Sequence, residues 1–72
     1  MTISADTTVA NLAQLLHETA ERHDRFEREA PKHDWWDWYA PYLNARLDGE
    51  ASEQATAAAD RYMKEAFNVV RG

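Results

Sequence analysis

The sequence predicts an all-α fold, arranged as a three-helix antiparallel bundle. Apolar side chains recur every three or four residues in three separate segments, the spacing that places them on one face of a helix. No segment shows the period-two alternation of a half-buried strand. Two prolines and two glycines interrupt the 72 residues, at Pro31, Pro41, Gly49 and Gly72. We therefore expect one helical domain over residues 1–72, with a flexible amino-terminal stretch at 1–7 and helices at about 8–30, 34–48 and 52–70.

The first predicted helix has a continuous apolar face. Its members follow helical spacing: Val9, Leu12, Leu16, Ala20, Phe26 and Ala30. Short polar side chains at its start offer oxygen acceptors for the free amides of the first turn, with Asp6, Thr7 and Thr8 as the candidates. Pro31 ends the helix, because proline disfavours helical geometry in the residue before it.

The second predicted helix begins at Asp34 and contains a proline. Asp34 is a good N-cap, and Asp37 three residues later resembles the second member of a capping box. Gly49 is the expected stop, because glycine adopts the left-handed conformation of a helix end at little cost. Pro41 removes one backbone hydrogen bond, so we expect a helix that bends at Pro41. The alternative is an irregular Trp-rich segment, with the helix starting near Ala40.

The third predicted helix runs from about 52 to 70, and Ser52 is its candidate cap. One apolar row consists of Ala55, Ala59, Tyr62, Ala66 and Val69, flanked by Ala58, Met63, Phe67 and Val70. The alanines favour helix formation and permit a neighbouring helix to approach closely. Short links between three such helices predict antiparallel neighbours.

The charge balance argues against nucleic acid and anionic membranes as partners. Thirteen acidic and eight basic residues give a net charge of −5, whereas nucleic-acid binding requires a basic surface. The arginines of the first helix alternate with acidic residues, which is typical of a solvated helix face: Arg22, Arg25 and Arg28. The chain has no cysteine, no apolar run of about 20 residues and no secretory leader pattern. We therefore expect a cytoplasmic protein.

Aromatic side chains are concentrated in the second helix. Five of the eight in the chain are Trp35, Trp36, Trp38, Tyr39 and Tyr42. A domain of this size has a thin core, so these rings exceed what a single copy is expected to cover. We expect Trp35 and Tyr39 in the core. Whether at least one of Trp36 and Trp38 is exposed stays open. A homodimer would cover the rings that remain exposed.

The same segment resembles a known module. Residues 32–43 have the sequence Lys-His-Asp-Trp-Trp-Asp-Trp-Tyr-Ala-Pro-Tyr-Leu, followed by Ala45-Arg46 and by Ala-Ala-Asp-Arg-Tyr-Met at 58–63. These stretches resemble a small helical module of actinobacterial proteins, which occurs alone or attached to glyoxalase/bleomycin-resistance-like domains. The vicinal-oxygen-chelate fold of those domains is built from strands, which this sequence lacks. The resemblance implies an all-helical accessory module and transfers no metal site, antibiotic binding or glyoxalase chemistry.

The histidines are the candidates for metal binding or acid–base chemistry. His17 and His23 each have a glutamate four residues later, but the two histidines lie about 120° apart around the helix and do not converge. We expect His17 at the surface and His23 within the apolar row. His33, with aspartates nearby, could serve as an oriented base; the structural alternative is that it packs against Trp38. We expect no metal, no cofactor and no catalytic residue.

The sequence favours a small interaction or accessory module that uses the aromatic second helix for self-association or for docking on a partner protein. The alternative is a domain that binds a planar apolar small molecule in an aromatic-lined pocket. Tyr42 and Arg46 are four residues apart, which permits the guanidinium to stack on the ring. The predicted contact residues are Trp35, Trp36, Trp38, Tyr39, Tyr42, Arg46, His33 and Asp37.

Overall fold

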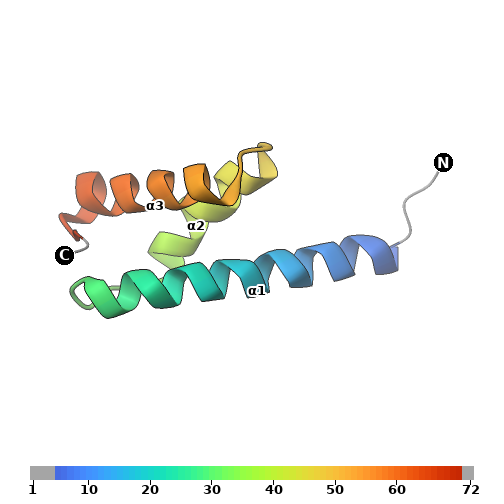
Figure 1. Cartoon of the computed structure of the whole chain (residues 1–72), viewed down its shortest axis with the longest axis horizontal. Coiled ribbons are helices and arrows are strands. Elements are labelled where there is room, and N and C mark those ends of the chain that lie inside the picture. Colours follow the sequence, from blue (N-terminus) through green and yellow to red (C-terminus); the bar gives the residue numbers. More distant parts are fainter. Residues whose placement is uncertain (1–4, 71–72) are drawn as a thin grey trace.

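Three helices make up most of the structure, a computed structural model that describes the backbone of residues 5–70 and the side chains of residues 9–70. α1 spans Ala5–Glu29, α2 spans Trp35–Leu47 and α3 spans Ser52–Phe67. Successive helices run in opposite directions, and α2 crosses obliquely between the other two (Figure 1). The predicted all-α, three-helix arrangement is confirmed. Within residues 5–70, no helix combines the length and the apolar character that crossing a membrane requires.

α1 starts earlier than the sequence indicated. It already contains the residues from Ala5 onward, so the candidate capping residues Asp6, Thr7 and Thr8 lie inside the helix, and their prediction as the cap is wrong. At its other end α1 stops at Glu29, as expected from the proline at position 31. Residues 30–34 then reverse the chain direction and lead into α2.

α2 continues through Pro41 without interruption, which excludes a helix that starts only near Ala40; the bend at Pro41 stays a prediction. Asp34 is the N-cap residue and has an extended backbone, but its carboxylate makes no capping hydrogen bond. Instead, the amide of Asp37 donates to the carbonyl oxygen of Asp34 at 3.2 Å. The expected capping box is therefore replaced by a backbone turn.

Gly49 ends α2 in the predicted left-handed conformation, with a φ of +95°. The Gly49 amide donates to the Arg46 carbonyl oxygen, and the Glu50 amide donates to that of Ala45, both at 3.0 Å. Together these bonds form a Schellman motif, which satisfies carbonyl groups that the last helical turn leaves free. The chain then needs only residues 48–51 to reach α3.

α3 begins at Ser52, so the side chain predicted to cap the helix belongs to its first residue instead. The helix ends at Phe67 and not at Val70, because Asn68 takes up the left-handed conformation with a φ of 56°. Asparagine tolerates this conformation better than most residues other than glycine. The resulting turn packs Val69 against the core.

The core lies where α2 meets both of its neighbours. Its buried apolar members come from all three helices: Phe26, Trp38, Tyr42, Ala45, Ala55, Ala59 and Met63. α2 makes its most extensive contacts with α3, where small alanine side chains leave room for the large rings of α2. The partly buried residues that pack against this cluster are Ala30, Tyr39, Ala58 and Val69.

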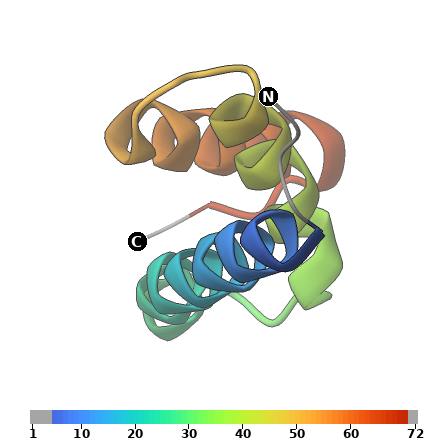
Figure 2. The same ribbon diagram turned by 90° about the vertical axis from the view of Figure 1, so that its right-hand side faces the viewer.

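The amino-terminal half of α1 extends beyond the other two helices (Figure 1). Figure 2 looks at the molecule from this end, nearly along α1, and shows α1 and α3 on opposite sides. The molecule measures 45 × 18 × 17 Å, and its radius of gyration is 13.3 Å, against about 11 Å for a compact domain of this length. One end of the molecule is thus a packed bundle, and the other is a single helix.

Candidate functional site

The aromatic residues of α2 divide into a buried group and an exposed pair. Trp38 and Tyr42 are fully buried, and Tyr39 is half-buried against the core. Trp35 and Trp36 are 54% and 52% exposed. The expectation that Trp35 belongs to the core is wrong. Of Trp36 and Trp38, whose exposure the sequence left open, the first is exposed and the second is buried. Rings on several sides of one helix cannot all face the same neighbour.

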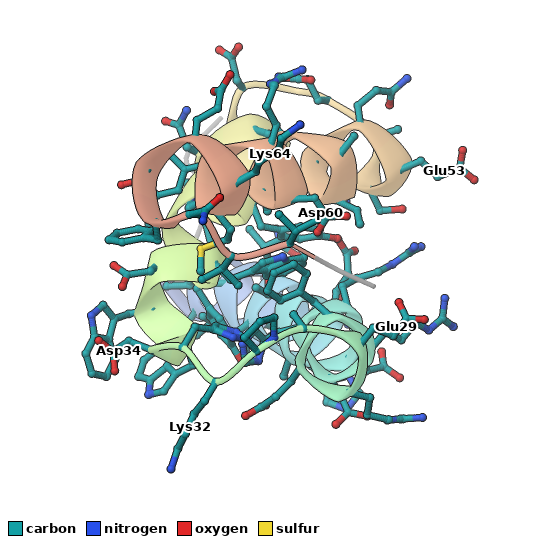
Figure 3. All side chains as sticks on the ribbon, turned by 90° about the vertical axis from the view of Figure 1, so that its left-hand side faces the viewer. Glu29, Lys32, Asp34, Glu53, Asp60 and Lys64 are labelled. Carbon is teal, nitrogen blue, oxygen red and sulfur yellow. The ribbon has the colours of Figure 1, made fainter. Side chains whose placement is uncertain are left out.

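Trp38 and Tyr42 form the centre of the buried group. Their rings are stacked, with centroids 5.1 Å apart and planes inclined by 19°. The indole Nε1 of Trp38 donates a hydrogen bond to Oδ1 of Asp60 on α3 at 3.1 Å. Figure 3 shows Asp60 on the side of α3 that faces the other helices, whereas Glu53 points outward. The bond satisfies the polar N–H of a buried indole and ties α2 to α3.

The hydroxyl group of Tyr42 meets a carboxylate from α1. It donates to Oε2 of Glu18, and Arg46 binds both oxygens of the same carboxylate, from Nε to Oε2 at 2.8 Å and from Nη2 to Oε1 at 3.3 Å. Hydrogen bonds from Arg46 and Tyr42 lower the pKa of Glu18. Burial and the hydrogen bond to Glu18 raise the pKa of Tyr42 to about 12. Arg46 and Tyr42 thus meet at a shared carboxylate, in place of the ring stacking that their spacing permits.

A pair of histidines joins α1 to the link before α2. The Nε2 atoms of His23 and His33 are 2.9 Å apart. Nδ1 of His33 is 2.8 Å from the carbonyl oxygen of Pro31, and because a carbonyl only accepts, this Nδ1 carries a hydrogen. In the neutral pair, His23 therefore donates from Nε2 to the bare Nε2 of His33. The His33 ring packs edge-on against Phe26 with centroids 4.9 Å apart, so it contacts α1 and not, as considered, Trp38.

His23 is buried, as expected from its place in the apolar row. Its ring also contacts Tyr39 and Trp38, at centroid distances of 5.3 and 5.7 Å. Burial lowers the pKa of His23 and outweighs the opposing effect of Glu27, whose Oε2 lies 3.6 Å from Nδ1. His23 is therefore held in its neutral form at neutral pH. His17, by contrast, is exposed on α1.

The histidine pair does not belong to a cluster of metal-binding side chains within the described residues. The part of the chain that the structure describes contains no group of three or more histidine, cysteine, aspartate or glutamate side chains placed to hold a metal ion. Both ring nitrogens of His33 are engaged by Pro31 and His23, so the base considered for His33 has no free nitrogen in the neutral pair. What these contacts provide is a fixed position for the start of α2 relative to α1.

A hollow of about 210 Å³ lies between α1 and the start of α3. Its lining is polar and charged: Glu18, Glu21, Arg22, Arg25 and Ser52. Nη2 of Arg22 donates to the hydroxyl oxygen of Ser52 at 3.1 Å. The aromatic contact residues predicted from the sequence do not line this hollow, so it gives no support to an aromatic-lined ligand pocket.

Trp35 and Trp36 together form an exposed aromatic area at the start of α2, which we call the tryptophan surface. Their rings meet edge-on with centroids 5.4 Å apart. Trp35 also lies edge-on against Tyr39 at 4.8 Å, and Tyr39 packs against the core. The exposed side chain of Asp34 precedes the pair and the half-buried Asp37 follows it. The surface is therefore supported from the core and flanked by acidic residues.

Two residues that matter for positioning α2 were missed by the sequence reasoning. Glu18 binds Tyr42 across 24 positions of the sequence, and Asp60 binds Trp38 across 22. No spacing within a single helix signals such long-range pairs. The available signal was chemical, because a buried tryptophan or tyrosine requires a polar partner for its N–H or O–H.

Comparisons with protein-family models, with curated proteins and with solved structures find no match for this chain. The structure shows a small, all-helical, three-helix protein, and the resemblance to a module of glyoxalase-like proteins stays an expectation.

Proposed function

We propose that this protein is a helical interaction module that docks on a partner protein through the tryptophan surface. The proposal is carried by the exposure of Trp35 and Trp36 in a helix whose other tryptophan is fully buried. Tryptophan contributes strongly to binding at interfaces, because it offers a large contact area with few rotatable bonds. An exposed pair of neighbouring indoles loses its contact with water when a partner covers it, which favours association.

The contacts of the tryptophan surface support a docking role because they restrain the rings before binding. Trp35 is held between Trp36 and Tyr39, so less side-chain freedom is lost when a partner binds. The flanking acidic groups of Asp34 and Asp37, in a chain of net charge −5, favour a partner with basic residues around an apolar pocket.

The remaining predicted contact residues have a different role in this proposal. Trp38, Tyr42 and Arg46 hold α2 against α3 and α1 through Asp60 and Glu18. They fix the orientation of the helix that presents the tryptophan surface, and they do not contact the partner themselves.

Site-specific photo-crosslinking in cells that produce the protein tests this proposal. A photoreactive amino acid replaces Trp35 and leaves Trp36 in place. The control carries it at Leu47, which is 73% exposed at the other end of α2. We expect an adduct with another protein from position 35 and not from position 47, and we expect the Trp36→Ser substitution to abolish it.

Three results would contradict the proposal. The first is equal adducts from positions 35 and 47, and the second is an adduct that survives Trp36→Ser. The third is an adduct with a mass of twice 8.3 kDa only, which would assign the tryptophan surface to self-association.

A further inference from the structure

α1 carries a line of residues that changes from buried to exposed halfway along the helix. The line, which we call the α1 seam, consists of Val9, Leu12, Leu16, Thr19, His23 and Phe26 and continues to Ala30. Its intervals alternate between three and four residues, the heptad spacing that places side chains along one edge of a helix. The same edge of α1 thus carries the spacing of a helix contact in both halves of the helix.

The carboxyl-terminal half of the α1 seam is covered within the chain. Thr19 and Phe26 are 0% exposed and His23 is 6% exposed. The hydroxyl of the buried Thr19 is satisfied by the carbonyl oxygen of Leu15 at 2.6 Å. This half of the seam is thus an established helix interface, with α2 and its preceding link as the partner.

The amino-terminal half of the same seam remains exposed. Val9 is 65%, Leu12 49% and Leu16 42% exposed, and they lie on the part of α1 that extends beyond the bundle (Figure 1). Apolar residues at heptad spacing are the usual contact positions between two packed helices. The residue spacing of the interface with α2 therefore continues toward the amino terminus, into a stretch that no described residue covers.

The distribution of charge along α1 indicates what covers the amino-terminal half of the α1 seam. Residues 7–16 contain no charged side chain, whereas residues 17–29 contain eight. Two copies of a chain with net charge −5 repel each other over most of their surface, but they meet no charge along this stretch. We propose that a second copy of this chain covers the amino-terminal half of the α1 seam, with its own α1 running antiparallel to that of the first.

The antiparallel direction follows from the fold. In a parallel pair the two bundle ends would lie side by side, where α2 already occupies the seam of each copy. In an antiparallel pair only the extended halves overlap, and each bundle lies at an opposite end. Ala13, which is exposed beside the extended half of the seam, allows the two helices to approach closely.

The contact is small, so the dimer is weak and transient. Three large apolar residues from each copy form its centre, which places the interface below the roughly 1,200 Å² of buried surface that characterises stable complexes. The contact also lies away from the tryptophan surface, since Trp35 follows the carboxyl-terminal end of α1. Pairing through α1 therefore leaves the proposed docking surface free, and the two proposals can fail independently.

Sedimentation equilibrium of the full chain tests the proposal, at concentrations from about 10 µM to 1 mM, the range of weak but specific association. We expect the average mass to rise from 8.3 kDa toward twice that value. The double substitution Leu12→Gln and Leu16→Gln should keep the protein monomeric over the whole range. Leu47→Gln makes the same chemical change at an exposed leucine outside the seam and should leave dimerisation intact.

Trp35→Ser serves as a second control and should also leave the dimer unchanged. Far-ultraviolet circular dichroism and the urea midpoint of unfolding report whether each variant retains its bundle. We expect the bundle to survive these substitutions, because the side chains of Leu12, Leu16, Leu47 and Trp35 are exposed in the wild-type fold. A wild-type chain that stays at 8.3 kDa up to 1 mM overturns the proposal. A dimer that survives the double leucine substitution, or one that is lost in Trp35→Ser, also overturns it.

Discussion

The Nε2 atoms of His23 and His33 are joined by one hydrogen bond of 2.9 Å, which requires one of the two nitrogens to be free of a proton. Protonation of both rings would place two N–H groups against each other. The other titratable side chains near His23 are Glu27 and Asp24 on its own helix and Tyr39 on α2, whose ring contacts the imidazole. Burial outweighs the two carboxylates and lowers the pKa of His23. The folded state therefore resists protonation of His23.

The protein should lose stability in mildly acidic solution. The folded-state pKa of His23 lies below its ordinary value of 6.5, so the unfolded chain takes up a proton first as the pH falls. This contribution to stability is complete above about pH 6.5 and is lost as the pH falls toward the folded pKa. We expect a lower urea midpoint at about pH 5.5 than at about pH 7.5. The His17→Gln control should show the same loss, and equal wild-type midpoints would contradict the prediction.

Glu18→Gln should weaken the junction between α1 and α2. The substitution removes the negative charge of the carboxylate that accepts hydrogen bonds from Arg46 and Tyr42. We therefore expect the free energy of unfolding to fall by about 1–3 kcal/mol. The pKa of Tyr42, now about 12, should fall because the neighbouring negative charge is gone. Chemical denaturation and an ultraviolet titration of tyrosine measure the two effects. Glu21→Gln, at an exposed site on the same helix, should change neither.

Replacing each of the three tryptophans by alanine should change the free energy of unfolding by very different amounts. Trp38→Ala removes a fully buried ring and its bond to Asp60, and we expect a loss of about 3–5 kcal/mol. The free energy of unfolding of a domain of this length is only about 4–11 kcal/mol, so this variant should be largely unfolded or close to it. Trp35→Ala and Trp36→Ala should each change stability by less than about 1 kcal/mol. Similar urea midpoints for all three variants would contradict the burial of Trp38 and the exposure of Trp35 and Trp36.

Gly49→Ala should destabilise the protein through backbone strain alone. A Cβ atom at this position meets no other atom within 4 Å, but the φ of +95° is unfavourable for alanine. We expect a loss of about 1–2 kcal/mol. Gly49→Asn should cost less, because asparagine tolerates left-handed backbone at helix ends. Thermal melts that rank alanine above asparagine in stability would contradict the prediction.

The order and approximate limits of the helices could be predicted from the sequence, because Pro31 and Gly49 act through local backbone geometry. The start and the end of α3 differ from the prediction, because more than one residue at each end can terminate the helix. The backbone of Ala51 takes the extended conformation of the N-cap, so Ser52 becomes the first residue of α3. Asn68 ends α3 early because a left-handed residue there lets Val69 pack against the core.

The orientation of α2 could not be predicted, because its rings are spread around much of the helix. Which of them is buried depends on where α3 presents Ala55 and Ala59, and these small residues lie against the side of α2 that carries Trp38 and Tyr42. This information resides in another helix. The sequence likewise marks His33 as a candidate base but does not identify His23 as its hydrogen-bond partner, because His23 belongs to α1 and His33 to the link before α2.

The extension of α1 beyond the bundle links helix formation to protein concentration. An isolated helical stretch of about ten residues is marginal in water, so its amides should exchange with solvent much faster than those beneath α2. If copies pair along this stretch, part of the energy of pairing is spent on suppressing fraying of the helix. Helicity would then rise on concentrating the protein, and the stretch would respond to small changes in solution conditions that leave the bundle intact.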